Sequence, residues 1–236
     1  MTNEMREYLL NLYNKCLSAK YTHLRNDADY AVEIDGNTMY LLFQWSNSTC
    51  DWFSNLDFFP EIVKPYKDMD NVWQCHEGFL RVWKEIKKDI ESNHILENLT
   101  EKGVEKIVCV GYSHGAAIAA LAHEYVWFNC PEIRENLTGY GFGAPRIFYG
   151  KMSDELAERW KTFYPIRSGN DIVTHVPPRM FRFRHVNEIT KLGTGKTTIK
   201  TKSDKKWLPK FVCAHNPTNY RNHIQNGEAK GALANK

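Results

Sequence analysis

A stretch with the residue types of a nucleophilic site lies near the middle of the chain. The sequence Gly-Tyr-Ser-His-Gly at residues 111–115 follows the apolar run 107–110 and precedes the alanine-rich run 116–122, so Ser113 falls between a predicted strand and a predicted helix. A tight strand-to-helix turn presents a serine hydroxyl to substrate, and flanking glycines let the strand and the helix approach closely. The pattern predicts a serine nucleophile at position 113.

A serine hydroxyl attacks a carbonyl carbon only when a histidine accepts its proton and a carboxylate orients that histidine. In α/β-hydrolases the acid and then the histidine follow the serine along the chain. Asp171 stands where an apolar strand pattern ends in a polar turn. Asp154 and Glu155 instead follow Ser153 at the start of a predicted surface helix, where acidic side chains stabilise the N-terminus. Position therefore favours Asp171 as the orienting acid.

The base must come from the histidines that follow the serine, which are His114, His123, His175, His185, His215 and His223. His114 adjoins the nucleophile, His123 falls within the helix after it, and His175 is only four residues from the proposed acid. These three are therefore set aside as bases. Of the remaining three, His215 lies on a loop just before a predicted C-terminal helix, where this fold supplies its base. We favour His215, with His223 and His185 as alternatives.

Hydrophobic periodicity indicates the elements that must position these groups. Helices are predicted over 4–18 and 78–91, a β-hairpin over 30–34 and 38–43, and buried strands over 107–110, 138–142 and 161–166. Strands that alternate with helices are typical of a mostly parallel sheet covered on both faces. We expect an α/β fold, the α/β-hydrolase fold, in a single domain over residues 1–236.

Composition is that of a globular protein with a sizeable core, since 42% of the 236 residues are hydrophobic and 13% are aromatic. The first six residues are polar, and the apolar pair at 9–10 is too short for a signal peptide or a membrane span. We therefore expect a soluble, cytoplasmic protein with no transmembrane segment. The six cysteines form no Cys-x-x-Cys pair, which favours reduced, mostly buried thiols.

Charge is unevenly distributed along the chain. Residues 179–210, here called the basic segment, contain ten Lys or Arg against Glu188 and Asp204, whereas the net charge of the whole chain is only +3. A solvated hairpin would explain such a segment, and so would attraction to anionic lipid headgroups. No nucleic-acid-binding motif accompanies the charge, so we expect no nucleic acid partner.

Several segments, taken in order, resemble the class 3 lipase family of fungal-lipase-like α/β-hydrolases. The matching stretches are 41–46 (a strand ending in Phe-Arg-Gly-Thr in the family), 51–56 (Asp-Trp-x-x-Asn), 76–79 (His-x-Gly-Phe), 140–146 (Thr-Phe-Gly-x-Pro-Arg), 171–178 (Asp-x-Val-Pro-x-x-Pro), and His215 with Tyr220 (a His-then-Tyr pattern of bacterial members). Each is weak alone, but their order and spacing are specific. A family His-Val-Gly segment of structural role resembles residues 185–187, which argues against His185 as the base.

The resemblance implies Ser113 as nucleophile, Asp171 as acid and His215 as base, with an oxyanion hole made by the backbone amides of Ser46 and His114. It implies no metal or organic cofactor. Gln44 and Trp45 stand where the family has Arg and Gly, so the corner that faces the nucleophile is bulkier and lacks a cation. A lid would fall at residues 56–74, which read equally well as an ordinary connecting loop.

The resulting hypothesis is a serine carboxylic ester hydrolase that acts on acylglycerol or phospholipid esters through an acyl-enzyme. Its partners would be a lipid or small ester substrate and, through the basic segment, weak contact with an anionic membrane surface. The alternatives are a catalytically silent lipase-like binding module, which only the corner at Gln44 and Trp45 supports, and an amide hydrolase with the same triad. Oligomeric state is not indicated by any pattern in the chain.

Overall fold

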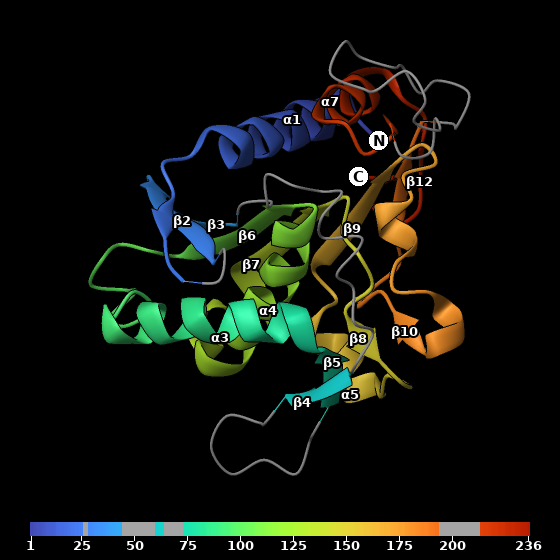
Figure 1. Ribbon diagram of the computed structural model, residues 1–236. Coiled ribbons are helices and arrows are strands. Elements are labelled where there is room, and N and C mark those ends of the chain that lie inside the picture. The colour runs from blue at the N-terminus through green and yellow to red at the C-terminus, as the bar shows by residue number, and fades with distance from the viewer. Residues whose placement is uncertain (26–27, 44–59, 64–72, 194–212) are drawn as a thin grey trace.

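An eight-stranded, mostly parallel sheet forms the centre of the protein (Figure 1). The computed structural model describes residues 1–25, 28–43, 60–63, 73–193 and 213–236. The strand order is β1-β2-β3-β6-β7-β9-β11-β12, and the pairs from β3 to β11 are parallel. The strands are β1 (Thr22–His23), β2 (Asp29–Asp35), β3 (Thr38–Phe43), β6 (Lys106–Tyr112), β7 (Leu137–Phe142), β9 (Phe163–Ser168), β11 (Thr190–Leu192) and β12 (Ala229–Lys230).

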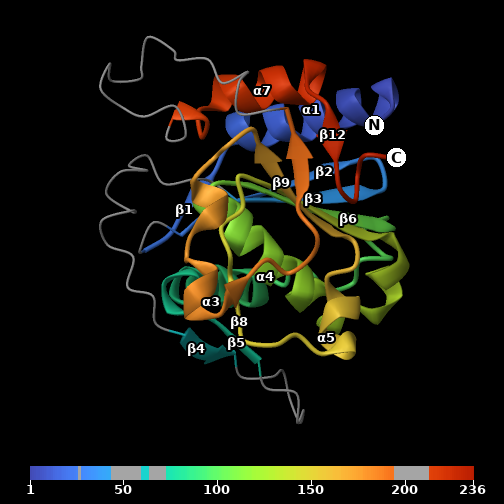
Figure 2. The ribbon, with the colours of Figure 1, turned by 90° about the vertical axis from the view of Figure 1, so that its right-hand side faces the viewer.

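Helices cover both faces of this sheet (Figures 1 and 2). One face carries α1 (Asn3–Ser18) and α7 (Pro217–Asn226), and the other carries α3 (Glu77–Ser92), α4 (His114–Asn129) and α5 (Asp154–Arg159). Strand β6 is apolar after its first residue because its side chains alternate between two cores: Ile107 and Cys109 pack with α3 and α4, whereas Val108 and Val110 pack with α1 and α7. The expected α/β fold with a covered parallel sheet is confirmed.

The predicted elements are present, with small shifts at their ends. The hairpin pairs β2 with β3 around the turn at Gly36, and the two helices predicted from periodicity are α1 and α3. Strand β9 begins two residues later than predicted, because residues 160–162 form the turn that follows α5. Ser153 caps α5 by accepting a hydrogen bond from the Leu156 amide, as expected for the acidic helix start.

A second, antiparallel sheet was not predicted. Its order is β10-β8-β5-β4, from β4 (Pro60–Val63), β5 (Trp73–His76), β8 (Phe148–Tyr149) and β10 (Phe183–Arg184). The candidate lid at 56–74 thus contains β4 and the start of β5, and its other residues lie outside the described part of the chain. Short strands paired across long sequence separations leave little periodic signal, so this sheet was missed.

The described part of the basic segment is not a hairpin. It contains the 3-10 helix η3 (Arg179–Phe181), followed by β10 and β11, which join different sheets. Residues 194–210 lie outside the described residues. The remaining 3-10 helices are η1 (Pro131–Asn136) and η2 (Val173–His175).

Five cysteines, namely Cys16, Cys75, Cys109, Cys130 and Cys213, are buried free thiols, and Cys50 lies outside the described residues. Burial raises the pKa of the Cys16 thiol to about 12. Among the described helices, none combines the length and the apolar character needed to cross a membrane.

Candidate active site

Ser113 occupies the turn between the end of β6 and the start of α4. Its backbone has φ 58° and ψ −123°, which is strained for a residue with a side chain. Two hydrogen bonds hold the turn, because the Ser113 amide donates to the Phe142 carbonyl at 2.8 Å and the Ala116 amide donates to the Ser113 carbonyl at 3.0 Å. The serine therefore sits on the strand-to-helix elbow that the sequence predicts.

The elbow depends on close approach of the strand to the helix. A Cβ atom added at Gly111 would lie 2.1 Å from the Gly115 carbonyl oxygen, so no side chain fits there. Gly143, at the end of β7, has φ 68°, and a Cβ atom there would lie 2.8 Å from Cε1 of His215. Glycine at these two positions leaves room for the elbow and for the imidazole beside it.

We predict that Gly111→Ala lowers the free energy of unfolding by about 3 kcal/mol, because the added methyl group overlaps main-chain atoms that cannot move without displacing α4. Urea denaturation followed by circular dichroism measures this change. The matched control is Gly36→Ala in the exposed hairpin turn, where a Cβ atom meets nothing within 4 Å. There only the positive φ is unfavourable, at about 1 kcal/mol. Equal losses at both positions would contradict the role given to Gly111.

The side chains of Ser113, His215 and Asp171 form one chain of hydrogen bonds. The Ser113 hydroxyl lies 2.7 Å from Nε2 of His215, and Nδ1 of His215 lies 2.7 Å from Oδ2 of Asp171. All three are buried, with Asp171 fully inaccessible to solvent. In this arrangement Nδ1–H donates to the carboxylate, which leaves Nε2 to accept the serine proton. The structure thus brings together the three residues that the sequence selected.

Aromatic contacts fix the position of His215. The Tyr112 ring stacks on the imidazole with 5.1 Å between centroids and 11° between planes, and the Tyr112 hydroxyl donates to the His215 carbonyl. The loop that carries His215 ends at α7, where the Asn216 side chain caps the helix by accepting from the Thr218 amide. His215 is therefore held by Tyr112, the residue directly before Ser113.

The Asp171 carboxylate accepts two hydrogen bonds besides that of the histidine. The Val173 amide donates to Oδ1 at 2.9 Å, and the Tyr220 hydroxyl of α7 donates to Oδ2 at 2.5 Å. Burial and the neighbouring carboxylate raise the pKa of Tyr220 well above its ordinary value, so the phenol stays protonated as a donor. The His-then-Tyr pattern of the family includes Tyr220, but the five-residue spacing from His215 does not reveal this contact with Asp171.

We predict that Tyr220→Phe lowers kcat for ester hydrolysis about tenfold, because a hydrogen bond to a charged group is worth about 1.5 to 3 kcal/mol and its loss lets Asp171 shift relative to His215. Steady-state kinetics with a soluble ester measures the change, and KM should stay close to the wild-type value. Tyr30→Phe is the control, since its hydroxyl also donates to a carboxylate at 2.5 Å, that of Asp89, far from the elbow in sequence. An unchanged kcat in Tyr220→Phe would contradict the prediction.

The other histidines have different partners. His223 bonds the Ser168 hydroxyl through Nδ1 at 2.7 Å, which ties α7 to β9. His185 donates from Nε2 to the Thr174 carbonyl at 2.9 Å, and burial lowers its pKa to about 3. Neither imidazole contacts the serine, so the geometry selects His215 from the three candidates that position left open.

Of the two residues expected to form an oxyanion hole, only His114 lies in the described part of the chain. His114 is the first residue of α4, where helix amides point toward the nucleophile end of the helix. Burial, followed by the charge of nearby His76, lowers the pKa of the His114 side chain to about 4, so the imidazole is neutral at neutral pH. Gln44, Trp45 and Ser46 lie outside the described residues.

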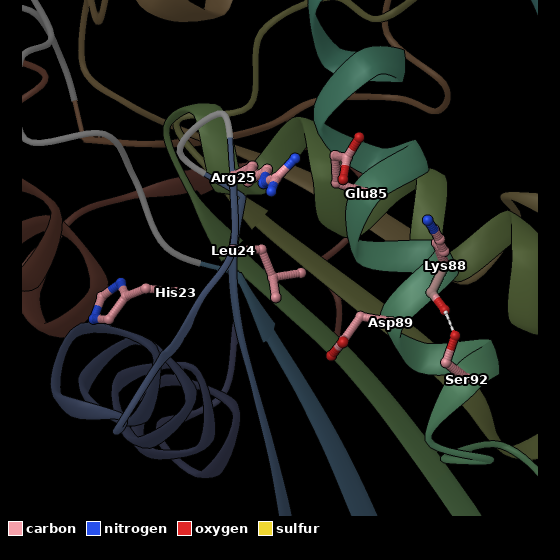
Figure 3. Close-up of a pocket in the computed structure, with 7 residues that line it drawn as sticks. All are labelled: His23, Leu24, Arg25, Glu85, Lys88, Asp89 and Ser92. Atoms are coloured by element: carbon pink, nitrogen blue, oxygen red, sulfur yellow. Dashed lines mark hydrogen bonds between the residues drawn. The ribbon is translucent and has the colours of Figure 1, made fainter.

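A cleft of 660 Å³ opens elsewhere, between β1 and α3 (Figure 3). Its lining is His23, Leu24, Arg25, Glu85, Lys88, Asp89 and Ser92. None of the predicted site residues is among them. Arg25 and Glu85 face each other from its two sides, so the cleft carries both positive and negative charge. Its lining residues do not gather groups of one kind around a single point, as a binding site for an ion would.

A mostly parallel sheet covered by helices, with a strained serine at the strand-to-helix turn beside a histidine and an aspartate, defines an α/β-hydrolase. Residues 40–181, well over half of the chain, match the family model described as Lipase (class 3). The chain belongs to the class 3 lipase family.

Relatives and solved structures agree with this assignment. A lipase of Rhizopus niveus is 29% identical over 186 residues, which are 77% of this chain and 46% of the relative, and a lipase of Rhizomucor miehei is 26% identical over 152 residues, 64% of this chain and 40% of the relative. The chain thus spans about half the length of the curated relatives it matches. The solved structure of lipase II from Rhizopus niveus has a TM-score of 0.66 at 21% identity and covers 82% of this chain and 83% of its own.

Proposed function

We propose that the chain is a carboxylic ester hydrolase that works through an acyl-enzyme. The observation that supports this most directly is the hydrogen-bonded chain from Ser113 through His215 to Asp171. The relatives it matches are named lipases, and one solved neighbour is a triacylglycerol lipase described as having a serine protease triad at its catalytic centre.

In the proposed reaction the Ser113 hydroxyl oxygen attacks the ester carbonyl carbon while Nε2 of His215 takes the hydroxyl proton. The tetrahedral intermediate then expels the alcohol, which receives that proton from His215. Water attacks the acyl-enzyme, His215 takes a proton from the water, and the carboxylic acid leaves as the proton returns to Ser113. The Asp171 carboxylate stabilises the imidazolium that forms in both halves of the reaction.

The negative oxygen of each tetrahedral intermediate needs donors close by. We propose the His114 backbone amide as one, because it follows the nucleophile at the N-terminus of α4. The resemblance to the family supplies Ser46 as the second. Loss of one such donor typically lowers kcat by about 10² to 10³.

Acylglycerols are proposed substrates, since a further relative, from Fusarium solani, is named a mono- and diacylglycerol lipase. Phospholipids are proposed as well, because the basic segment would attract anionic headgroups. The test measures hydrolysis of p-nitrophenyl esters of increasing acyl length, then of emulsified diacylglycerol and of phosphatidylcholine. Hydrolysis of these esters with a matched p-nitroanilide left intact supports the proposal. A protein that hydrolyses no ester is a silent binding module, and one that prefers the anilide is an amide hydrolase.

A further inference from the structure

A projecting loop begins a few residues after Asp171 and is closed at its base. His185 donates to the Thr174 carbonyl at 2.9 Å, so the two ends of the loop are joined. The Arg146 guanidinium, which comes from outside the loop, donates to the carbonyls of His175 and Pro177 and so fixes the first part of the loop. The outer part, residues 179–184, is here called the arginine-flanked tip.

The tip is anchored in the protein while its outermost residues face solvent. Phe183 is fully buried, and its ring packs on that of Tyr149 with 5.3 Å between the ring centroids. The pairing of β10 with β8 holds its backbone. The side chains of Met180 and Phe181, in contrast, are 81% and 46% exposed. Figure 1 shows this region near β10 at the right-hand edge of the molecule. Two adjacent large apolar side chains are thus held out toward water on an ordered support.

Positive charge surrounds these two side chains. Arg179, Arg182 and Arg184 are all exposed, and no Asp or Glu occurs from residue 172 to residue 187. The Arg182 guanidinium lies over the Tyr149 ring at 5.3 Å, and Nε of Arg184 donates to the Gly150 carbonyl at 3.0 Å. Two of the three arginines are therefore held against β8 and the residue that follows it.

The one further large hydrophobic side chain that is exposed in the described part of the chain has different surroundings. Ile34 is 52% exposed but stands alone, between Glu33 and Asp35 on β2. Single exposed hydrophobic residues of this kind are common and need no partner. In Figure 1, β2 lies at the edge opposite β10, so Ile34 serves as an internal comparison.

We propose that the arginine-flanked tip docks the protein on an anionic lipid surface. Met180 and Phe181 enter the boundary between headgroups and acyl chains, and the arginines bind the anionic headgroups around them. A stable protein partner would need about 800 Å² of matching surface on each side, which a narrow projection of six residues does not offer, whereas a bilayer adapts to it. Docking would bring the loop between Thr174 and His185, which follows Asp171 in the chain, to the lipid surface.

This inference goes beyond the proposed function, because docking needs no ester hydrolysis. The test therefore uses the full chain carrying Ser113→Ala, which leaves the lipid intact. Its binding to vesicles of phosphatidylcholine alone and of phosphatidylcholine with about 30 mol% phosphatidylglycerol is measured by sedimentation. We expect at least about tenfold tighter partitioning to the anionic vesicles, reduced by added salt because screening shortens the reach of the charges.

Two double variants separate the contributions of charge and of insertion. Arg179→Gln with Arg182→Gln should lower the partition coefficient about 30-fold, at about fivefold for each charge near the surface. Met180→Ser with Phe181→Ser should lower it about tenfold or more through lost apolar burial. The matched controls are Lys88→Gln with Lys106→Gln, which remove two exposed charges elsewhere, and Ile34→Ser; both should change the coefficient less than about twofold.

Thermal unfolding of each variant checks that the fold is retained. Equal binding to neutral and anionic vesicles would overturn the proposal, and so would undiminished binding of the arginine variant, which would place the attraction elsewhere in the chain. Loss of binding in the arginine variant without loss in the Met180 and Phe181 variant would show attraction without insertion and would also overturn it. Absent ester hydrolysis by the wild-type chain would count against the proposed function alone.

Discussion

Replacing Ser113 with alanine should lower kcat/KM for ester hydrolysis by about 10⁶-fold while the protein stays folded. The serine hydroxyl is the one group in the hydrogen-bonded chain that can form a bond to the acyl carbon, and loss of the nucleophile in a comparable triad costs about as much as loss of the whole triad. Hydrolysis of a p-nitrophenyl ester measures the change. The free energy of unfolding should change little, because the substitution removes only the hydroxyl oxygen of a buried side chain and keeps its Cβ atom.

A labelled fluorophosphonate tests the same residue without a substrate. The wild-type protein should be labelled at Ser113, and Ser113→Ala should not be labelled. Ser92→Ala is the matched control, since this exposed serine ends α3 and its hydroxyl bonds only the Lys88 carbonyl among the interactions shown (Figure 3). Equal labelling of the wild type and Ser113→Ala would rule out Ser113 as the nucleophile.

The strand-to-helix elbow at Ser113 could be predicted from the sequence for a local reason. A strand, a serine with glycines two residues away on either side, and a small-residue helix are all set by neighbouring residues, so a short window of sequence contains the whole elbow. Asp171 and His215 could be selected because Asp171 follows a recognisable strand and His215 precedes a recognisable helix, and the order along the chain reduced the number of candidates. Their meeting is a property of the parallel sheet, which aligns the ends of β6 and β9.

What the sequence did not reveal depends on contacts between distant elements. The second sheet joins β5 to β8 across some 70 residues of chain, and no periodicity signals such a pairing. The bond from Tyr220 to Asp171 depends on the rotation of α7 about its own axis, which packing against α1 and β9 determines. The two exposed apolar residues of the arginine-flanked tip could not be distinguished from the rest of the basic segment in the sequence, because their exposure follows from the burial of Phe183 beside them.

The acid should be the second most sensitive position, with Asp171→Asn lowering kcat by about 10⁴-fold. Asparagine nearly matches the size of the carboxyl group, but one of its two polar atoms is an amide nitrogen that donates. The Val173 amide and the Tyr220 hydroxyl already direct donors at this side chain. With fewer acceptors available, Nδ1 of His215 no longer has a charged partner for its proton. The tautomer with the proton on Nε2 becomes favourable, and that nitrogen then cannot accept the proton of Ser113.

Asp154→Asn is the control for this comparison, because Asp154 was the competing acid and lies in the first turn of α5. It should retain full activity. The effects should therefore fall in a fixed order: Ser113→Ala largest, Asp171→Asn next, Tyr220→Phe smallest and Asp154→Asn absent. Since Tyr220 acts only through Asp171, adding Tyr220→Phe to Asp171→Asn should lower kcat by much less than the tenfold expected in the wild-type background. Independent, multiplying effects would contradict the positioning role of Tyr220, and an active Asp171→Asn would contradict the assignment of the acid.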